Sequence, residues 1–211
     1  MTTETASRLT PKGRATRARI VEAASDLVFA HGVARTSVED VQQAAGVSAS
    51  QLYHYFGDKQ TLIRSVIAHQ ADAVIEAQQP WLGQLDSIDG LMAWRDALVA
   101  LQVSRSCAGG CAIGSIAAEV ADDDPVARVD LAEGYERWEH HIRQGLRSMH
   151  ARGELTADAD PDRLALALLA ALQGGLILTQ TRRDPTPLAV ALDVAIDHIR
   201  DCLRTGDTAV A

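Results

Sequence analysis

The stretch SVEDVQQAAGVSASQLYHYFGDKQTLI, residues 37–63, contains two short helical patterns with a glycine between them. Gly46 ends the first pattern at a sharp turn, because glycine readily adopts the left-handed conformation that closes many helices. Ser48 can cap the second pattern, which covers residues 49–56. The order of helix, glycine turn and helix predicts a helix-turn-helix, whose second helix enters the major groove of DNA.

Helical patterns also flank this stretch. Apolar residues recur at helical spacing over residues 16–30, and Gly32 ends that helix. Ser37, with Asp40 three positions later, resembles a capping box at the start of the next helix. Asp58 can cap a further helix after the stretch. The sequence therefore predicts a three-helix head, followed by a helix that connects it to the rest of the chain.

Aromatic side chains gather at the end of the second pattern, although Phe, Trp and Tyr make up only 4% of the chain. Leu52 and Phe56 lie four positions apart, so both can face the core of the head. Tyr53 and Tyr55 then point elsewhere, either as ordinary surface or core filling or toward DNA. Their hydroxyls, like the ammonium of Lys59, suit the phosphate oxygens of DNA.

Short and amide side chains occupy the leading turn of the same helix, at Ala49, Ser50 and Gln51. A glutamine can pair with adenine, and a serine can serve several bases. We therefore expect phosphate contacts to fix register and affinity, while the leading turn reads the base sequence.

The charge of the chain is unevenly distributed, which fits an anionic partner at one end only. Residues 1–70 hold 8 Lys and Arg against 6 Asp and Glu, a net charge of +2, whereas residues 71–211 hold 12 against 22, a net charge of −10. Arg8, Lys12, Arg14, Arg17 and Arg19 form the basic cluster. Arg14 and Arg17 could reach an adjacent groove or belong to a solvated tail.

These motifs together resemble the DNA-binding segment of TetR-type transcriptional regulators. That pattern has a helix ending in Ala-Gly-Val, a short helix ending in Tyr-x-x-Phe and a lysine that opens the next helix; residues 45–47, residues 53–56 and Lys59 match it. The resemblance covers about residues 15–65. The family commonly has a basic residue or glycine at the positions of Ala49 and Ser50, so this departure leaves the operator sequence open.

The resemblance implies a role for each matching position. Backbone phosphates would be contacted by Thr36, Ser37, Ser48, Tyr53, Tyr55 and Lys59. Bases would be faced by Ala49, Ser50 and Gln51. The partner would be a palindromic operator in double-stranded DNA, bound by a homodimer whose two heads occupy two half-sites.

Composition predicts an all-α fold. The chain has 211 residues, and 47% of them are hydrophobic, so it can bury a substantial core without disulfide or metal support. It contains only 6 prolines, which favours helices. We expect a flexible basic arm over residues 1–15 and the helix-turn-helix domain over residues 16–62. A helical effector-binding and dimerisation domain then covers residues 63–205, and residues 206–211 form a flexible tail.

The segment from residue 164 to residue 181 carries no charge and is apolar all round. It is at the short limit for crossing a bilayer, so we interpret it as a buried helix and expect no membrane association. Packing inside the monomer is one explanation for its apolar faces; the resemblance favours a four-helix dimer interface. The candidate interface residues are Leu164, Ala167, Ala171, Gly174, Gly175, Leu188, Leu192, Ala195 and Ile199.

The remaining helices of such regulators normally enclose a small-molecule site. The candidates here, each of which could also be plain core, are Trp94, Leu98, Leu101, Ile113, Ile116, Tyr135, Trp138, Ile142 and Gln173. Their apolar character suggests an uncharged or lipophilic effector. Such an effector would release a repressor from its operator only by binding one conformation better than the other.

Other classes of function find less support. The sequence has no nucleophile elbow, no HExxH and no phosphate loop, so we expect neither an enzyme nor a cofactor. Glu136 and His140, four positions apart, could share an ion, but a surface pair is the simpler interpretation and we expect no metal.

Two further alternatives remain open. Cys107 and Cys111 could form a switchable disulfide in a thiol-based redox regulator, or could be ordinary small apolar residues. The last helices could also serve a helical scaffold that does not bind DNA. The chain starts without a signal-peptide pattern and has an odd number of cysteines, so we expect a cytoplasmic protein.

Overall fold

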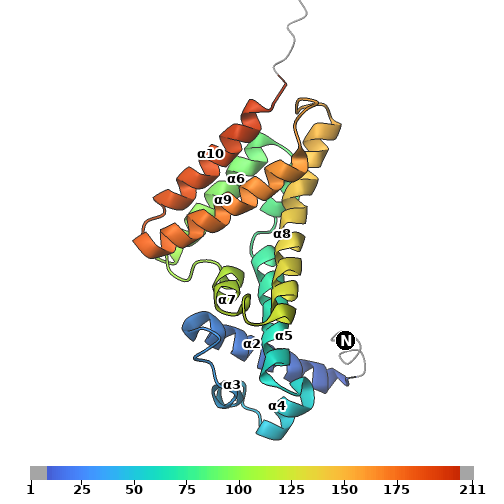
Figure 1. Cartoon of the computed structure of the whole chain (residues 1–211), viewed down its shortest axis with the longest axis vertical. Coiled ribbons are helices and arrows are strands. Elements are labelled where there is room, and N and C mark those ends of the chain that lie inside the picture. Colours follow the sequence, from blue (N-terminus) through green and yellow to red (C-terminus); the bar gives the residue numbers. More distant parts are fainter. Residues whose placement is uncertain (1–8, 205–211) are drawn as a thin grey trace, which may run out of the picture. The chain divides into compact units, whose positions relative to one another are not determined.

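The computed structural model describes residues 9–204, and these residues form helices joined by short loops (Figure 1). Within that range the only β-structure is an isolated bridge between Leu155 and Leu203, so the predicted all-α class is confirmed. The remaining residues of the predicted arm, 1–8, and of the predicted tail, 206–211, lie outside the described part of the chain.

The first described helix, α2, covers Pro11–His31 and so begins earlier than the predicted start at residue 16. The Thr10 hydroxyl accepts a hydrogen bond from the Gly13 N–H at 3.1 Å, and Pro11 occupies the first helical position, where its fixed φ is already suitable. Residues 11–15, predicted to be part of a flexible arm, are therefore helical.

The helix-turn-helix is formed by α3 (Val38–Ala45) and α4 (Ala49–Phe56). Both helices begin with a capping box, in which the side chain of the third residue bonds back to the cap. Gly46 connects them with φ 62° and ψ 44°, a left-handed conformation that disfavours residues with a Cβ. The helix boundaries and the turn agree with the sequence pattern.

The remaining helices follow in chain order. They are α5 (Lys59–Glu76), the short η1 (Trp81–Gln84), α6 (Ile88–Ser104), α7 (Ala112–Val120), α8 (Pro125–Ala151), α9 (Pro161–Arg182) and α10 (Thr186–Asp201). The N-terminal boundary of α9 illustrates the local rule: the Asp160 carboxylate accepts a bond from the Asp162 N–H at 3.0 Å, and Pro161 follows the cap.

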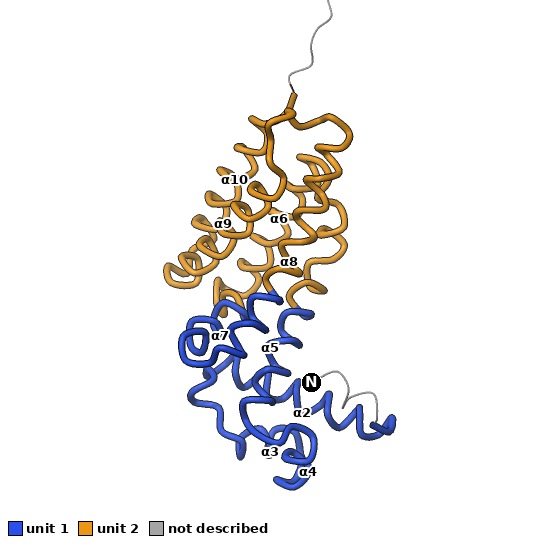
Figure 2. Tube along the Cα trace, turned by 45° about the vertical axis from the view of Figure 1, so that its right-hand side comes forward, with its two compact units in different colours: residues 1–73, 112–134 blue, residues 74–111, 135–211 orange. Residues whose placement is uncertain are grey.

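The chain divides into two compact units (Figure 2). The first contains the residues up to Ala73 and residues 112–134; the second contains residues 74–111 and the chain from Tyr135 onward. The sequence pattern predicts a single boundary after residue 62. The division differs because α7 and the start of α8 pack with the head.

Specific polar contacts hold these later residues in the first unit. The Glu119 carboxylate on α7 accepts a hydrogen bond from the Ala34 N–H at 3.1 Å. The Arg64 guanidinium on α5 donates to both carboxylate oxygens of Asp130 on α8, at 2.6 Å and 3.1 Å, in the bidentate geometry that arginine favours. Local sequence patterns did not indicate either long-range pair.

The core of the second unit is built from α6, α8, α9 and α10 around the buried Trp94 and Trp138. Helix α9 is the single described helix that is long and apolar enough to cross a membrane. One side of it is buried inside this unit, including Leu168, Leu172 and Thr179, as expected for a core helix.

Candidate nucleic-acid interface and ligand pocket

Helix α4 divides into a packed face and an exposed face. Leu52 and Phe56 are buried in the head, as their four-residue spacing predicts. The exposed face carries Ala49, Ser50, Gln51, Tyr53 and His54. Tyr53 is 50% exposed, so much of this residue is available to a partner surface. His54 was not among the candidates from sequence, although its position next to Tyr53 places it on the same face.

The Gln51 side chain, which was expected to face bases, forms part of the cap of α4. Its Oε1 accepts a hydrogen bond from the Ser48 N–H at 3.0 Å, while its own N–H donates to the Ser48 hydroxyl at 3.2 Å. A bidentate contact with adenine needs both Oε1 and Nε2. In this geometry Oε1 already serves the capping box, so a base contact through Gln51 uses Nε2 or opens the cap.

Thr36 and Ser37 both use their side-chain donors inside the head. Thr36 is 2% exposed, and its hydroxyl donates to the Gly32 carbonyl at 2.8 Å. The prediction of a side-chain phosphate contact is therefore wrong for Thr36. The hydroxyl and the N–H of Ser37 both point at the Asp40 carboxylate, at 2.6 Å and 2.9 Å, so both of its donors are already engaged.

The same bonds change the acidity of Asp40. Hydrogen bonds from the hydroxyl and then the backbone N–H of Ser37 lower the pKa of the Asp40 carboxyl below its ordinary value. Asp40 is therefore ionised at neutral pH. A carboxylate beside Ser37 disfavours an approaching phosphate, which further weakens Ser37 as a contact.

Ser48, Tyr55 and Lys59 keep some capacity for phosphate contacts. The Ser48 hydroxyl is exposed, and its donation to Gln51 Oε1 is long, at 3.4 Å. Tyr55 is half-buried. Lys59 Nζ donates to the Val33 carbonyl at 3.1 Å, which uses one of its three N–H groups.

Two arginines of the basic cluster stabilise the head itself. The guanidinium of Arg17 lies 5.0 Å from the centre of the Phe56 ring and donates to the Ser65 hydroxyl at 2.8 Å. Burial lowers the pKa of Arg17, which remains charged. Arg19 Nε donates to the Ala45 carbonyl at 2.9 Å, at the end of α3. Of the two arginines considered for an adjacent groove, only Arg14 remains exposed.

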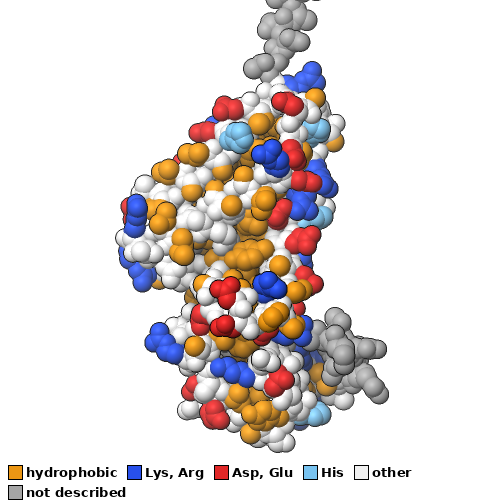
Figure 3. Space-filling view, viewed as in Figure 1, with side chains coloured by type: hydrophobic (Ala, Val, Ile, Leu, Met, Phe, Trp, Pro, Cys, Tyr) orange, Lys and Arg blue, Asp and Glu red, His pale blue; other side chains and the backbone are white. Residues whose placement is uncertain are grey.

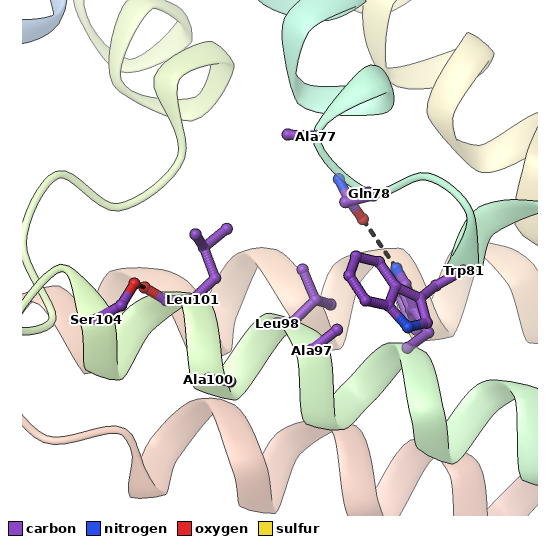
Figure 4. Close-up of a pocket in the computed structure, with 9 residues that line it drawn as sticks. Ala77, Gln78, Trp81, Ala97, Leu98, Ala100, Leu101 and Ser104 are labelled. Carbon is purple, nitrogen blue, oxygen red and sulfur yellow. Dashed lines mark hydrogen bonds between the residues drawn. The ribbon is translucent and has the colours of Figure 1, made fainter.

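The second unit contains a half-open pocket of about 360 Å³ along α6 (Figure 4). Trp94, Leu98 and Leu101, all candidates from sequence, line it. Six further residues line it that were not among the candidates from sequence: Ala77, Gln78, Trp81, Ala97, Ala100 and Ser104. Ala97 and Ser104 share the helical stripe of the three candidates, so three- and four-residue spacing could have identified them.

The structure does not bring the remaining pocket candidates to this cavity. Ile113 and Ile116 are buried in the first unit, whereas Trp138 and Ile142 belong to the core of the second. Three of these candidates, Tyr135, Trp138 and Gln173, carry polar groups that are buried. Burial, with a smaller effect of Cys111, raises the pKa of the Tyr135 phenol, and among the described residues neither Trp138 Nε1 nor Gln173 Nε2 has a hydrogen-bond partner.

The outer surface of α9 and α10 is rich in hydrophobic side chains (Figure 3). The large exposed residues on it are Leu166, Ile177, Leu178, Val190 and Val194. They recur at helical spacing on each helix, with the exposed Ala167 and Gly174 between them on α9. We call this set the α9/α10 face. Large exposed apolar patches are common at interaction sites, so this face is the candidate surface for a partner.

Several predicted interface residues lie elsewhere. Leu164, Gly175, Leu188, Leu192 and Ile199 are buried inside the monomer, so they are not available to a partner and that assignment is corrected. Ala171 and Ala195 are half-buried. Because α9 is apolar on every side, its sequence could not show which side packs inward.

The thiol-based alternative gains no support. Cys107 is 3% exposed, and its carbonyl accepts a hydrogen bond from Arg183 Nη1 at 3.3 Å. An oxidant therefore has little access to its sulfur. Across residues 9–204, no three His, Cys, Asp or Glu side chains are arranged to hold a metal ion.

Two family models match the chain. The model described as bacterial regulatory proteins, tetR family, matches residues 20–66, and the tetracyclin repressor-like C-terminal domain matches residues 87–195. The transcriptional regulator AcuR of Cereibacter sphaeroides is 27% identical over 179 residues, which cover 80% of this chain and 78% of AcuR. The transcriptional repressor DhaR of Mycobacterium sp. (strain GP1) is 23% identical over 199 residues, which cover 87% and 91%.

Solved structures agree with these matches. A TetR transcriptional regulator from Chloroflexus aurantiacus has a TM-score of 0.75 and 27% identity, covering 93% of this chain and all of that one, 100%. The C-terminal model alone spans more than half of the chain, and the helix-turn-helix is matched independently. The chain belongs to the TetR family of transcriptional regulators, with an N-terminal DNA-binding helix-turn-helix and a helical C-terminal body.

Proposed function

We propose that this protein is a homodimeric repressor that binds a palindromic operator through α4 and is released by a small apolar molecule. The observation that carries the proposal is the exposed face of α4, which leaves Ser50, Gln51 and Tyr53 outward while Leu52 and Phe56 hold the helix in the head. Short polar side chains on the first turn suit base edges, and Tyr53 and Lys59 suit phosphates.

The α9/α10 face supports a dimer. A single helix-turn-helix makes few base contacts, and such domains usually act in pairs on two half-sites. Two copies related by a two-fold axis would bury this face against itself, as an isologous interface requires. The symmetry of the dimer would then make the operator palindromic.

The pocket supports control by a ligand. Gln78 and Ala77, which line it, follow directly after α5, and α5 begins at Lys59 beside the helix-turn-helix. A ligand that favours one arrangement of this helix would change the population of DNA-binding heads. DhaR, a relative over most of the chain, is itself a transcriptional repressor.

We place the protein in the cytoplasm, where a bacterial transcriptional regulator meets its DNA.

Affinity selection of genomic DNA fragments tests the proposal. The purified protein would be incubated with fragments at about 150 mM salt, since nonspecific binding is steeply salt-dependent. A shared palindrome among the recovered fragments is the expected result. The control is the Tyr53→Ala, Lys59→Ala variant, checked by circular dichroism because Lys59 also donates to the Val33 carbonyl.

A reporter gene separates repressor from activator. With the recovered operator placed over a constitutive promoter, expression should fall when the protein is present and should not fall with the double variant. No enrichment over the variant would contradict DNA recognition through α4, and increased expression would contradict the repressor assignment alone.

A further inference from the structure

The pocket along α6 owes its space to small side chains. Ala77, Ala97 and Ala100 line it where larger residues would fill it. Its wide apolar walls are Trp81, Leu98 and Leu101, with Trp81 beside the Gln78–Trp94 hydrogen bond (Figure 4). Trp81 is half-buried, so part of this residue remains accessible. A flat ring can stack on an indole in this arrangement.

The polar atoms of the wall are largely engaged by the protein. Gln78 Oε1 accepts from Trp94 Nε1 at 2.9 Å, and Gln78 Nε2 donates to the Val74 carbonyl at 2.8 Å. The Ser104 hydroxyl donates to the Leu101 carbonyl at 2.8 Å. Gln78 keeps one N–H, and both oxygens keep lone pairs. The wall can therefore satisfy one neutral polar group of a ligand.

The wall offers no counter-charge. None of the residues that line the pocket has an acidic or basic side chain. A buried charge without a partner is strongly disfavoured. Anions face a second obstacle, because residues 71–211 carry 12 Lys and Arg against 22 Asp and Glu. At about 360 Å³, the cavity lies near the lower end of typical ligand sites.

We infer that the pocket binds a small, neutral, largely apolar ligand with a ring that stacks on Trp81. Binding itself is measured without DNA, whereas its regulatory consequence rests on the proposed function. Selection against charged ligands would distinguish this pocket from a general apolar surface, which would also take up charged amphiphiles.

Displacement of a neutral fluorescent probe tests this inference. N-phenyl-1-naphthylamine would be titrated into the full-length protein, and its emission should rise saturably. Three competitors share one ring system: 1-naphthalenemethanol is neutral, 1-naphthylmethylamine is a cation and 1-naphthoate is an anion. The neutral competitor should displace the probe at a concentration at least about tenfold lower than either charged one, a difference of about 1.4 kcal/mol.

Matched variants locate the probe. Ala97→Leu fills the pocket and should weaken probe binding at least about tenfold, since it removes the space for a ring. Ala93→Leu makes the same change on the same helix at an exposed position outside the wall and should leave binding unchanged. Ala100→Leu is a second filling variant at a more exposed position, in case Ala97→Leu does not fold.

The outcomes are separable from those for the proposed function. Equal displacement by the three competitors, or full probe binding to the folded filling variants, overturns the inference, as does the absence of probe binding to the wild type. If the pocket selects the neutral competitor but the probe does not release the operator, the ligand class stands and the release mechanism of the proposed function fails.

Discussion

The amide oxygen of Gln51 accepts a hydrogen bond from the Ser48 N–H at 3.0 Å, and the Gln51 N–H donates to the Ser48 hydroxyl at 3.2 Å. This capping box fixes the start of α4, the helix that we expect to read bases. The residue that would carry base recognition is thus also the residue that stabilises the helix.

Gln51→Glu should separate these two roles. Glutamate at this position preserves a capping box, so the free energy of unfolding should change by less than about 0.5 kcal/mol. Its carboxylate cannot donate to adenine and is repelled by phosphates, so operator affinity should fall at least about tenfold.

Gln51→Ala should instead lose about 0.5–1 kcal/mol of stability and relax the base preference. An unchanged preference in Gln51→Ala would leave Gln51 as a cap only. Fluorescence anisotropy with operator variants measures both effects.

Thr36→Val should affect stability without affecting phosphate contacts. It removes the buried hydroxyl that donates to the Gly32 carbonyl, so the free energy of unfolding should fall by about 1–2 kcal/mol. The slope of log affinity against log salt should stay as in the wild type, whereas Lys59→Met should reduce its magnitude by about 1. A reduced slope for Thr36→Val would restore Thr36 as a phosphate contact. Urea unfolding and salt titrations of operator binding provide the two measurements.

Val194→Lys should disrupt the dimer. Val194 lies on the α9/α10 face and is 65% exposed, so lysine is compatible with the folded monomer. In a two-fold interface it would place charges against apolar partner surface, and the protein should become monomeric with much weaker operator binding. Val129→Lys is the matched control, because Val129 is 52% exposed on α8 and lies outside this face. Sedimentation equilibrium distinguishes the two variants; a dimeric Val194→Lys protein would move the interface elsewhere.

Gly175→Ala and Gly174→Ala should have opposite effects on the folded chain. A Cβ at Gly175 would lie 2.9 Å from Leu188 Cα, so α9 and α10 must separate, at a cost of about 1–3 kcal/mol. A Cβ at Gly174 would meet no described atom within 4 Å, and helix propensity should stabilise the chain by about 0.5–1 kcal/mol. Urea unfolding in the Val194→Lys background compares them, because Gly174 lies on the α9/α10 face and dimer stability would otherwise contribute. Equal destabilisation would argue against the observed packing of α9 on α10.

Asp40 should make the head sensitive to acid. Hydrogen bonds from Ser37 lower the pKa of this carboxyl in the folded state, so the stabilisation is complete above the unfolded pKa and is lost as the pH falls through the lower folded pKa. Asp40→Asn lacks this titration, so the stability difference between wild type and variant should shrink as the pH falls through that range. A carboxyl titration by NMR that places the pKa of Asp40 above that of an ordinary aspartate would contradict the capping geometry.

Local chemistry alone determined much of the head. Ser37 and Gly46 specify where α3 begins and ends, and Ser48 specifies where α4 begins, because caps and left-handed glycines act within a few residues of one another. The spacing of Leu52 and Phe56 likewise specifies which face of α4 packs inward. These short-range patterns were sufficient to predict the helix-turn-helix and the exposed face that we propose reads DNA.

Tertiary structure decided what depends on distant partners. Packing within the head leaves Thr36 only 2% exposed, and Arg17 stabilises the head because Phe56 and Ser65 come to lie beside it. On α9 the sequence is apolar all round, so only packing against α10 shows that Gly175 faces inward and Ile177 outward. The spacing of apolar residues shows which faces of a helix can be buried, but not which neighbouring helix covers each face. That depends on packing across the whole chain.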